Sequence, residues 1–198
     1  MLSVLTTTTA LLDELFDTAN DVAWQAFNAR YQPILHAFAR RLGVSEADAA
    51  DVAQETLVRF VKDYRAGKYD RSKGRLRSWI ISIAKYRVAD LRHDTVRRRQ
   101  VRGDSVLVDL PDENHLNAIW EEECLHAIVH HAMAELRERG TLDSNTISVF
   151  ERTTFDECTT AEVAAEFEMT PNAVYKVKRR CLAQLRLIMA RLKEAYEL

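Results

Sequence analysis

The sequence is poor in cysteine, and its three cysteines, Cys124, Cys158 and Cys181, stand far apart. No two of them have the spacing of a disulfide framework or of a zinc site, which indicates a reducing compartment, the cytoplasm. Residues 1–10 lack a cationic start and contain only a brief apolar stretch. The sequence therefore predicts neither a signal peptide nor a membrane span.

Motifs typical of enzymes are also missing. The sequence has no P-loop, no GxGxxG and no HExxH, so the usual phosphate-binding and zinc-hydrolase sites are not predicted. His126, His130 and His131 follow Cys124 on one expected helix, and a four-residue histidine spacing suits a metal ion. Neighbouring histidines on a surface helix more often have no such role. We expect no enzyme activity, no catalytic residue, no metal site and no cofactor.

Charge is distributed unevenly along the chain. The net charge of −2 argues against a wholly basic, histone-like protein. Residues 71–102, however, contain eleven Lys or Arg and only two acidic residues, whereas residues 104–168 contain sixteen acidic residues and three Arg. A second cationic stretch follows near the C-terminus. Two cationic surfaces separated by an acidic module indicate two contacts on one long anionic ligand.

Helical periodicity dominates, and no stretch shows the alternation of a strand. We predict an all-α fold made of two small helical bundles joined by a flexible linker. The predicted divisions are an N-terminal tail over residues 1–20, a first bundle over 21–93, a linker over 94–117 and a second bundle over 118–198. The linker is placed where periodicity fades and the charge changes from basic to acidic.

A helix-turn-helix is predicted near the C-terminus. Thr159 and Glu162 have the spacing of a capping box, and Thr170 before Pro171 marks a second helix start. Apolar residues at three- and four-residue steps assign one stripe of the second helix to the core. The opposite side carries Asn172, Tyr175, Lys176 and Arg179. These side chains suit a DNA recognition helix, the alternative being a solvated basic helix.

The helix expected after Ser45 has two chemically different sides. One side carries apolar or small residues: Val52, Ala53, Thr56, Leu57, Phe60, Val61 and Tyr64. The other carries Asp51, Gln54, Glu55, Val58, Arg59 and Lys62. Carboxylates would repel phosphates, so this second side is not a DNA surface and could instead bind a protein. Periodicity alone favours the simpler alternative, a solvated helix with acid–base pairs at four-residue spacing.

The order of these segments resembles a known family. The stretch ADAADVAQETLVRFVKDYRAGKYDRSKGRLRSWIISIAKYRVADLRH, residues 47–93, resembles region 2 of the extracytoplasmic-function sigma factors of the sigma-70 family, and residues 143–192 resemble their region 4. The likeness spans about 24–93 and 118–192. It implies a dissociable subunit that directs core RNA polymerase to promoters and initiates transcription by binding the minus-35 and minus-10 elements and melting the DNA.

The resemblance also implies roles for individual residues. The side chains that would bind core polymerase, through its clamp helices, are Asp51, Gln54, Glu55, Val58, Arg59 and Lys62. Those that would bind the minus-10 element are Tyr69, Lys73, Arg75, Arg77, Lys85, Tyr86, Arg87 and Arg92. Those that would bind the minus-35 element are Thr170, Asn172, Tyr175, Lys176, Arg179 and Arg180. Trp79 lies in the apolar stripe, so we expect core packing before a stacking role.

The partners of the chain are implied by the same resemblance. The implied partners are core RNA polymerase, through its clamp helices and flap, and promoter DNA. Family members are often held inactive by an anti-sigma factor, and no motif in the chain identifies one. This chain departs from the family motif at two positions, because it has Tyr86 where the family usually has Asn and Leu76 where the family usually has Phe.

The alternative function is a helix-turn-helix repressor or activator that acts without docking on core polymerase.

Overall fold

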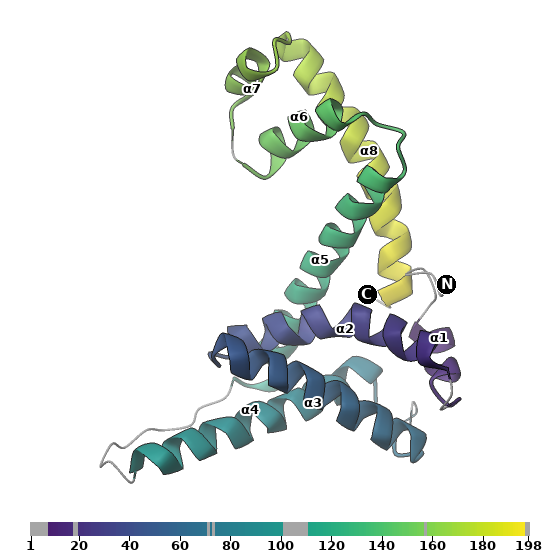
Figure 1. The fold of residues 1–198 in the computed structure, drawn as a ribbon, viewed down its shortest axis with the longest axis vertical. Coiled ribbons are helices and arrows are strands. Elements are labelled where there is room, and N and C mark those ends of the chain that lie inside the picture. Colours follow the sequence, from purple (N-terminus) through teal and green to yellow (C-terminus); the bar gives the residue numbers. More distant parts are fainter. Residues whose placement is uncertain are drawn as a thin grey trace. The chain divides into compact units, whose positions relative to one another are not determined.

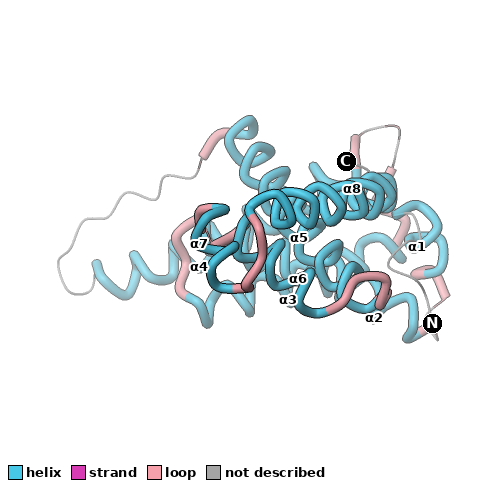
Figure 2. The backbone as a smooth tube through the Cα atoms, turned by 90° about the horizontal axis from the view of Figure 1, so that it is seen from above, coloured by secondary structure: helices cyan, strands magenta, loops and turns pink. Residues whose placement is uncertain are grey.

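The computed structural model describes residues 8–17, 20–70, 72, 74–100, 111–156 and 158–196, with the backbone alone described for residues 8 and 94–100. All regular elements in these ranges are helices, and no strand occurs among them (Figure 2). The predicted all-α class is therefore confirmed. No helix in the described part of the chain is both long enough and apolar enough to cross a membrane.

Eight helices make up the described part of the chain, in the order α1 (Thr8–Glu14), α2 (Asp21–Arg41), α3 (Glu46–Arg65), α4 (Leu76–Gln100), α5 (Glu113–Glu138), α6 (Ser144–Thr154), α7 (Thr160–Glu166) and α8 (Pro171–Tyr196) (Figure 1). They form two compact units, residues 1–127 (unit 1) and 128–198 (unit 2). Helix α5 contributes its first half to unit 1 and its second half to unit 2.

Unit 1 is built on α2, α3 and α4, with α3 packed against both neighbours (Figure 1). The side chains of Asn20 and Ser45 accept hydrogen bonds from backbone amides at the starts of α2 and α3, which fixes both helix starts. The rings of Phe27 and Phe60 are fully buried and stack with their centroids 5.0 Å apart. After α3 the chain turns at Gly67, whose φ of 70° is readily adopted only by glycine.

Parts of three helices of unit 1 lie where the sequence analysis placed a tail and a linker: α1, the end of α4 (94–100) and the start of α5 (113–117). Helix α1 and the turn after it bury Leu11 and Leu15 completely, and α1 contacts α2. It has only seven residues, too few turns for periodicity to reveal it. Helix α5 begins at Glu113, and its Trp120 is 2% exposed and packs near the rings of Tyr31 and Phe38. The domain boundaries themselves stay a prediction.

Unit 2 places α6 and α7 against the long helix α8. Val149 of α6, Val163 and Ala164 of α7 and Val174 of α8 form one buried cluster. The periodic stripe predicted for the last helix is buried at Val174, Cys181, Leu185 and Ile188, while Val177 packs partly buried against the same cluster. This packing exposes the opposite side of the first turns of α8.

Candidate protein and nucleic-acid interfaces

Helix α3 separates core residues from surface residues as its sequence pattern predicts. The side expected to be apolar is buried at all seven positions: Val52, Ala53, Thr56, Leu57, Phe60, Val61 and Tyr64. The opposite side is exposed at all six positions of the predicted polymerase-binding set: Asp51, Gln54, Glu55, Val58, Arg59 and Lys62. The structure therefore brings this set together on one exposed surface.

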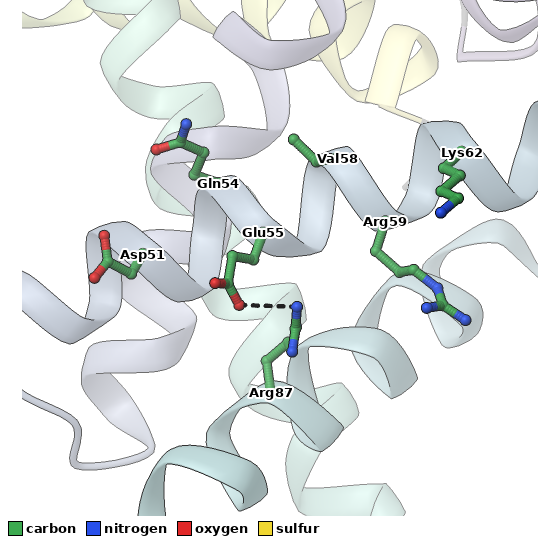
Figure 3. A pocket seen from close by; sticks show the side chains of 7 residues that line it. All are labelled: Asp51, Gln54, Glu55, Val58, Arg59, Lys62 and Arg87. Carbon is green, nitrogen blue, oxygen red and sulfur yellow. Dashed lines mark ion pairs between the residues drawn. The ribbon is translucent and has the colours of Figure 1, made fainter.

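A groove of about 510 Å³ runs beside this surface of α3 (Figure 3). It is lined by the six side chains just named and by Arg87, which comes from α4. A guanidinium nitrogen of Arg87 lies 3.0 Å from a carboxylate oxygen of Glu55. Val58 is 54% exposed and adds an apolar contact to an otherwise polar or charged wall. A mixed-charge groove with an exposed apolar side chain suits a protein partner better than a polyphosphate.

The basic end of this surface is held by Asp63, which sequence analysis did not identify. Its carboxylate is almost completely buried and accepts hydrogen bonds from Arg59 Nε at 2.5 Å and from Lys68 Nζ at 2.8 Å. The bond from Lys68, followed by that from Arg59, lowers the pKa of Asp63, although burial opposes them. The acid–base spacing of Arg59 and Asp63 was the only signal for this pair in the sequence.

The loop between α3 and α4, which carries the first residues of the predicted minus-10 set, is tied to the core by aromatic contacts. Tyr69 stacks on Trp79 with ring centroids 5.2 Å apart and planes inclined by 11°. The Tyr69 hydroxyl donates to the carbonyl of Gly74 across the loop at 3.4 Å. Trp79 also meets Phe60 edge-on at 5.1 Å. Trp79 is thus partly buried between core and loop, and Lys73 lies outside the described residues.

The segment after α1 braces the start of this loop. The ring of Phe16 lies 4.6 Å from the ring of Tyr64, at the end of α3. Arg65 Nε donates to the carbonyl of Leu15 at 2.8 Å. Burial is the main cause that raises the pKa of Tyr64. Both contacts are long-range in sequence, so no local pattern predicts them.

The cationic side chains of α4 that the structure describes do not share one surface. Arg77 Nη1 lies 2.6 Å from a carboxylate oxygen of Glu121, within unit 1. Arg92 donates a hydrogen bond to the carbonyl of Leu42 at the end of α2. Arg87 lines the α3 groove described above. Three arginines assigned to the minus-10 element from sequence are therefore engaged in contacts inside unit 1.

A different side of α4 remains open. Arg75 is exposed immediately before the helix, and Tyr86 is 68% exposed. Eleven residues separate them, so at about 100° per residue they project to nearly the same side. Lys85, next to Tyr86, is half-buried. Of the predicted minus-10 side chains on α4, these are the ones the structure leaves best placed for an extended ligand.

The helix-turn-helix of unit 2 forms as its capping residues predict. The Thr159 hydroxyl accepts from the amide of Glu162 at 3.3 Å, and the Glu162 carboxylate accepts from the amide of Thr159 at 2.8 Å. The Thr159 hydroxyl also donates to the Glu162 carboxylate at 2.7 Å, and this bond, followed by that from the Thr159 amide, lowers the pKa of Glu162. The Thr170 hydroxyl accepts from the amide of Ala173 at 3.2 Å, which caps the start of α8. Between the helices, Glu168 adopts a φ of 52°.

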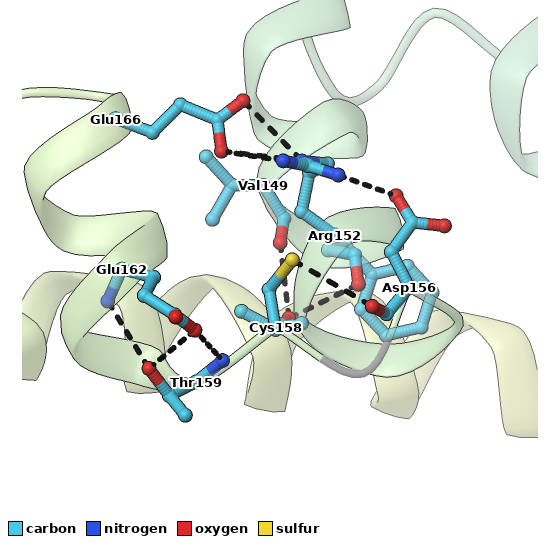
Figure 4. A network of polar contacts seen from close by, with 9 residues as sticks. Val149, Arg152, Asp156, Cys158, Thr159, Glu162 and Glu166 are labelled. Atoms are coloured by element: carbon cyan, nitrogen blue, oxygen red, sulfur yellow. Dashed lines mark hydrogen bonds and ion pairs between the residues drawn. The ribbon is translucent and has the colours of Figure 1, made fainter.

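A network of ion pairs joins α6 to α7 (Figure 4). Arg152 of α6 pairs with Glu166 of α7 at 3.0 Å and with Asp156 at 3.2 Å. Lys178 of α8 donates to the carbonyl of Thr153, at the end of α6, at 2.9 Å. Together these contacts link α6 to both helices of the helix-turn-helix, α7 and α8.

The predicted minus-35 residues lie on one exposed part of unit 2. All six are exposed: Thr170, Asn172, Tyr175, Lys176, Arg179 and Arg180. Tyr175 is 61% exposed, so its ring is available to a ligand. Arg180 donates to the carbonyl of Thr141 at 3.3 Å, whereas no ion pair holds Lys176 or Arg179 among the described residues. Free cations beside amide and phenol groups suit contacts to phosphates and base edges.

The groove, the aromatic loop and the arginine-rich helix all fall within one sequence match. Residues 28–100 match the family described as Sigma-70 region 2. We call residues 28–100 region 2, because they are similar to this family. This supports a sigma factor of the sigma-70 family, a class of DNA-binding regulators that act with RNA polymerase. No curated protein sequence matches the chain.

Proposed function

We propose that the chain is a sigma factor of the extracytoplasmic-function type. In this role it directs core RNA polymerase to specific promoters, binds their minus-35 and minus-10 elements and melts the DNA. The polymerase supplies the catalysis, and the chain supplies recruitment and sequence recognition without a cofactor of its own. Such a protein works in the cytoplasm.

The observation that carries this proposal is the groove of region 2. Its α3 wall consists of the six side chains expected to bind polymerase, and it lies within the Sigma-70 region 2 match. Its acidic side chains disfavour DNA, and its exposed Val58 favours a protein surface. The partner we propose for it is the pair of clamp helices of the polymerase, while the polymerase flap is a second contact implied by the resemblance to the family.

Two further surfaces are proposed to bind promoter DNA. In region 2 these are the loop and the open side of α4, with Tyr69, Arg75, Lys85 and Tyr86. In unit 2 it is the exposed part of the helix-turn-helix. Stacking aromatics and cations suit single-stranded DNA, as a melted minus-10 element presents, and a recognition helix suits the major groove of a duplex.

The proposal is tested by adding the chain to core RNA polymerase and a library of promoter fragments. Specific transcripts are expected only when chain and core are both present. The double variant Asp51→Arg with Glu55→Arg is expected to abolish core binding while the fold survives. A matched control, Glu138→Arg with Glu194→Arg, makes the same charge change at exposed positions of unit 2 and is expected to bind core normally.

One other outcome of this experiment favours the alternative function. If the chain binds a duplex operator tightly by itself and never associates with core polymerase, it is a helix-turn-helix repressor or activator.

An anti-sigma factor is a further partner that the family resemblance suggests. Affinity purification of the tagged chain from its own cell would reveal such a protein beside the polymerase subunits.

A further inference from the structure

Among the described residues, Arg87 is the one residue of α4 that lines the groove of region 2. The side chain is 40% exposed, and its Nη2 atom lies 3.0 Å from Glu55 Oε2 on α3. Its Nη1 atom is 3.9 Å from a carboxylate oxygen of Asp90, one helical turn further along α4. Figure 3 shows the guanidinium reaching from α4 toward the Glu55 carboxylate. Arg87 therefore forms the opposite wall of a groove whose other wall is the predicted docking side of α3.

The charges around Arg87 oppose a phosphate ligand. A phosphate bound to its guanidinium would lie within a few ångströms of Glu55 and Asp90, with Asp51 along the same groove. Each carboxylate would repel the phosphate, and the repulsion is strong at such short range. Arg75 and Tyr86 lie on the open side of α4, where Arg75 makes no ion pair with an acidic side chain among the described residues. The geometry separates Arg87 from the DNA-facing residues of its own helix.

Arg87 also makes the acidic end of the groove suitable for a protein. Asp51 and Glu55 are four residues apart on α3, so they are neighbouring carboxylates on one helix surface. Arg87 offsets this like-charge pair and holds the Glu55 carboxylate in one position. A partner that covers the groove then contacts a carboxylate that is already ordered. Less conformational entropy of the Glu55 side chain is lost on binding, which favours the complex.

We infer that Arg87 is a positioning residue of the surface that docks on core RNA polymerase, where it fixes Glu55, and that it does not hold promoter phosphates. This inference rests on the proposed function. It adds Arg87, which the sequence analysis assigned to the minus-10 DNA, to the docking groove as its second wall. In the free chain the Glu55–Arg87 pair is half-exposed, so it contributes little to stability. In the complex water is excluded, and removal of either member leaves the other charge buried without its partner.

The experiment compares Arg87→Ala, Glu55→Gln and the double variant in the full chain, by titration with labelled core polymerase. Each single variant is expected to weaken core binding by about tenfold. The double variant is expected to bind no more weakly than the weaker single variant, because neither charge is then left unpaired. Arg87→Lys, which keeps the charge, is expected to recover part of the affinity. Circular dichroism and thermal unfolding should show unchanged folds.

A second readout uses saturating chain, so that all polymerase carries it, and measures binding of a single-stranded minus-10 oligonucleotide. Arg87→Ala is expected to leave this binding unchanged, whereas the matched α4 control Lys85→Ala is expected to weaken it and to leave core affinity intact. The inference is overturned if Arg87→Ala retains core affinity, if it weakens binding of the oligonucleotide, or if the single losses multiply in the double variant. The proposed function fails separately, if the unaltered chain does not associate with core polymerase.

Discussion

Tyr69 and Trp79 stack face to face, with ring centroids 5.2 Å apart. One residue belongs to the loop that follows α3, and the other belongs to the first turn of α4. Because Trp79 also contacts the buried Phe60, the stack connects the loop directly to the core of region 2. One face of Tyr69 is therefore already occupied in the free chain. A flipped base would stack on its other face or would separate the two rings.

Replacement of Trp79 by Ala removes this connection. We expect the free energy of unfolding to fall by about 2–3 kcal/mol, since a half-buried aromatic side chain and two ring contacts are lost. Trp79→Phe keeps one ring and should cost less than about 1 kcal/mol. Urea unfolding measures both changes. If the two variants are equally stable, the stacked pair does not secure the loop.

The same pair of variants also tests the role of the loop in binding DNA. Assembled with core polymerase, Trp79→Ala is expected to bind a single-stranded minus-10 oligonucleotide more weakly than Trp79→Phe, because a loosened loop loses its preformed stacking surface. Equal DNA binding by the two variants would place base capture elsewhere on region 2.

Local sequence patterns predicted the helices and their caps well. The buried and exposed sides of α3 follow directly from about 100° per residue. Ser45 and Thr159 cap the helices that follow them because a short hydroxyl side chain is followed by free backbone amides. These features depend on residues within one or two turns of each other, so the sequence contains all the information needed.

Contacts between distant segments were not predictable in this way. Arg87 was assigned to DNA because it is one of many cations on α4, and only the packing of α3 against α4 brings it to Glu55. Helix α1 was missed because it is short. Trp120 was placed in the second bundle, although the rings it contacts belong to α2. A one-dimensional pattern gives the side of a helix that is buried but not the helix that covers it.

The buried carboxylate of Asp63 predicts a dependence of stability on pH. Its pKa is lowered by the hydrogen bonds from Lys68 and Arg59, so its pKa in the folded state lies below that in the unfolded state. The stabilisation is fully present above about pH 4 and is lost as the pH falls through the folded-state pKa. The Asp63→Asn variant should therefore have a smaller free energy of unfolding than the original chain near pH 7. On acidification, its free energy of unfolding should fall by less than that of the original chain.

Urea unfolding at several pH values between neutrality and about pH 3 measures this difference. Lys68→Ala removes the contact that lowers the pKa of Asp63 most, so its pH profile should lie between those of the original chain and Asp63→Asn. Parallel profiles for all three proteins would show that Asp63 does not titrate at a lowered pKa.

Trp120 tests whether the first half of α5 packs in unit 1. Its side chain is 2% exposed, 5.8 Å in ring distance from Phe38 and 6.5 Å from Tyr31. Trp120→Ala is expected to reduce the free energy of unfolding by about 3–5 kcal/mol. Leu125→Ala, on the same helix but 40% exposed, should cost less than about 1 kcal/mol. A small effect of Trp120→Ala would mean that this half of α5 does not belong to the core of unit 1.

Arg179 and Arg180 are adjacent on α8 and both exposed, yet they have different surroundings. Arg180 donates to the carbonyl of Thr141, whereas no ion pair holds Arg179 among the described residues. If the exposed part of the helix-turn-helix reads the minus-35 element, Arg179→Ala should weaken binding of that duplex by about tenfold, and Arg180→Ala should have a smaller effect. Both variants should keep full affinity for core polymerase, because the proposed docking groove lies in region 2. Fluorescence anisotropy with a labelled minus-35 duplex, in parallel with core titration, separates the two activities. Equal loss of duplex and core binding by Arg179→Ala would show that the DNA surface of unit 2 has been assigned to the wrong residues, since a side chain that serves only DNA cannot change the affinity for core.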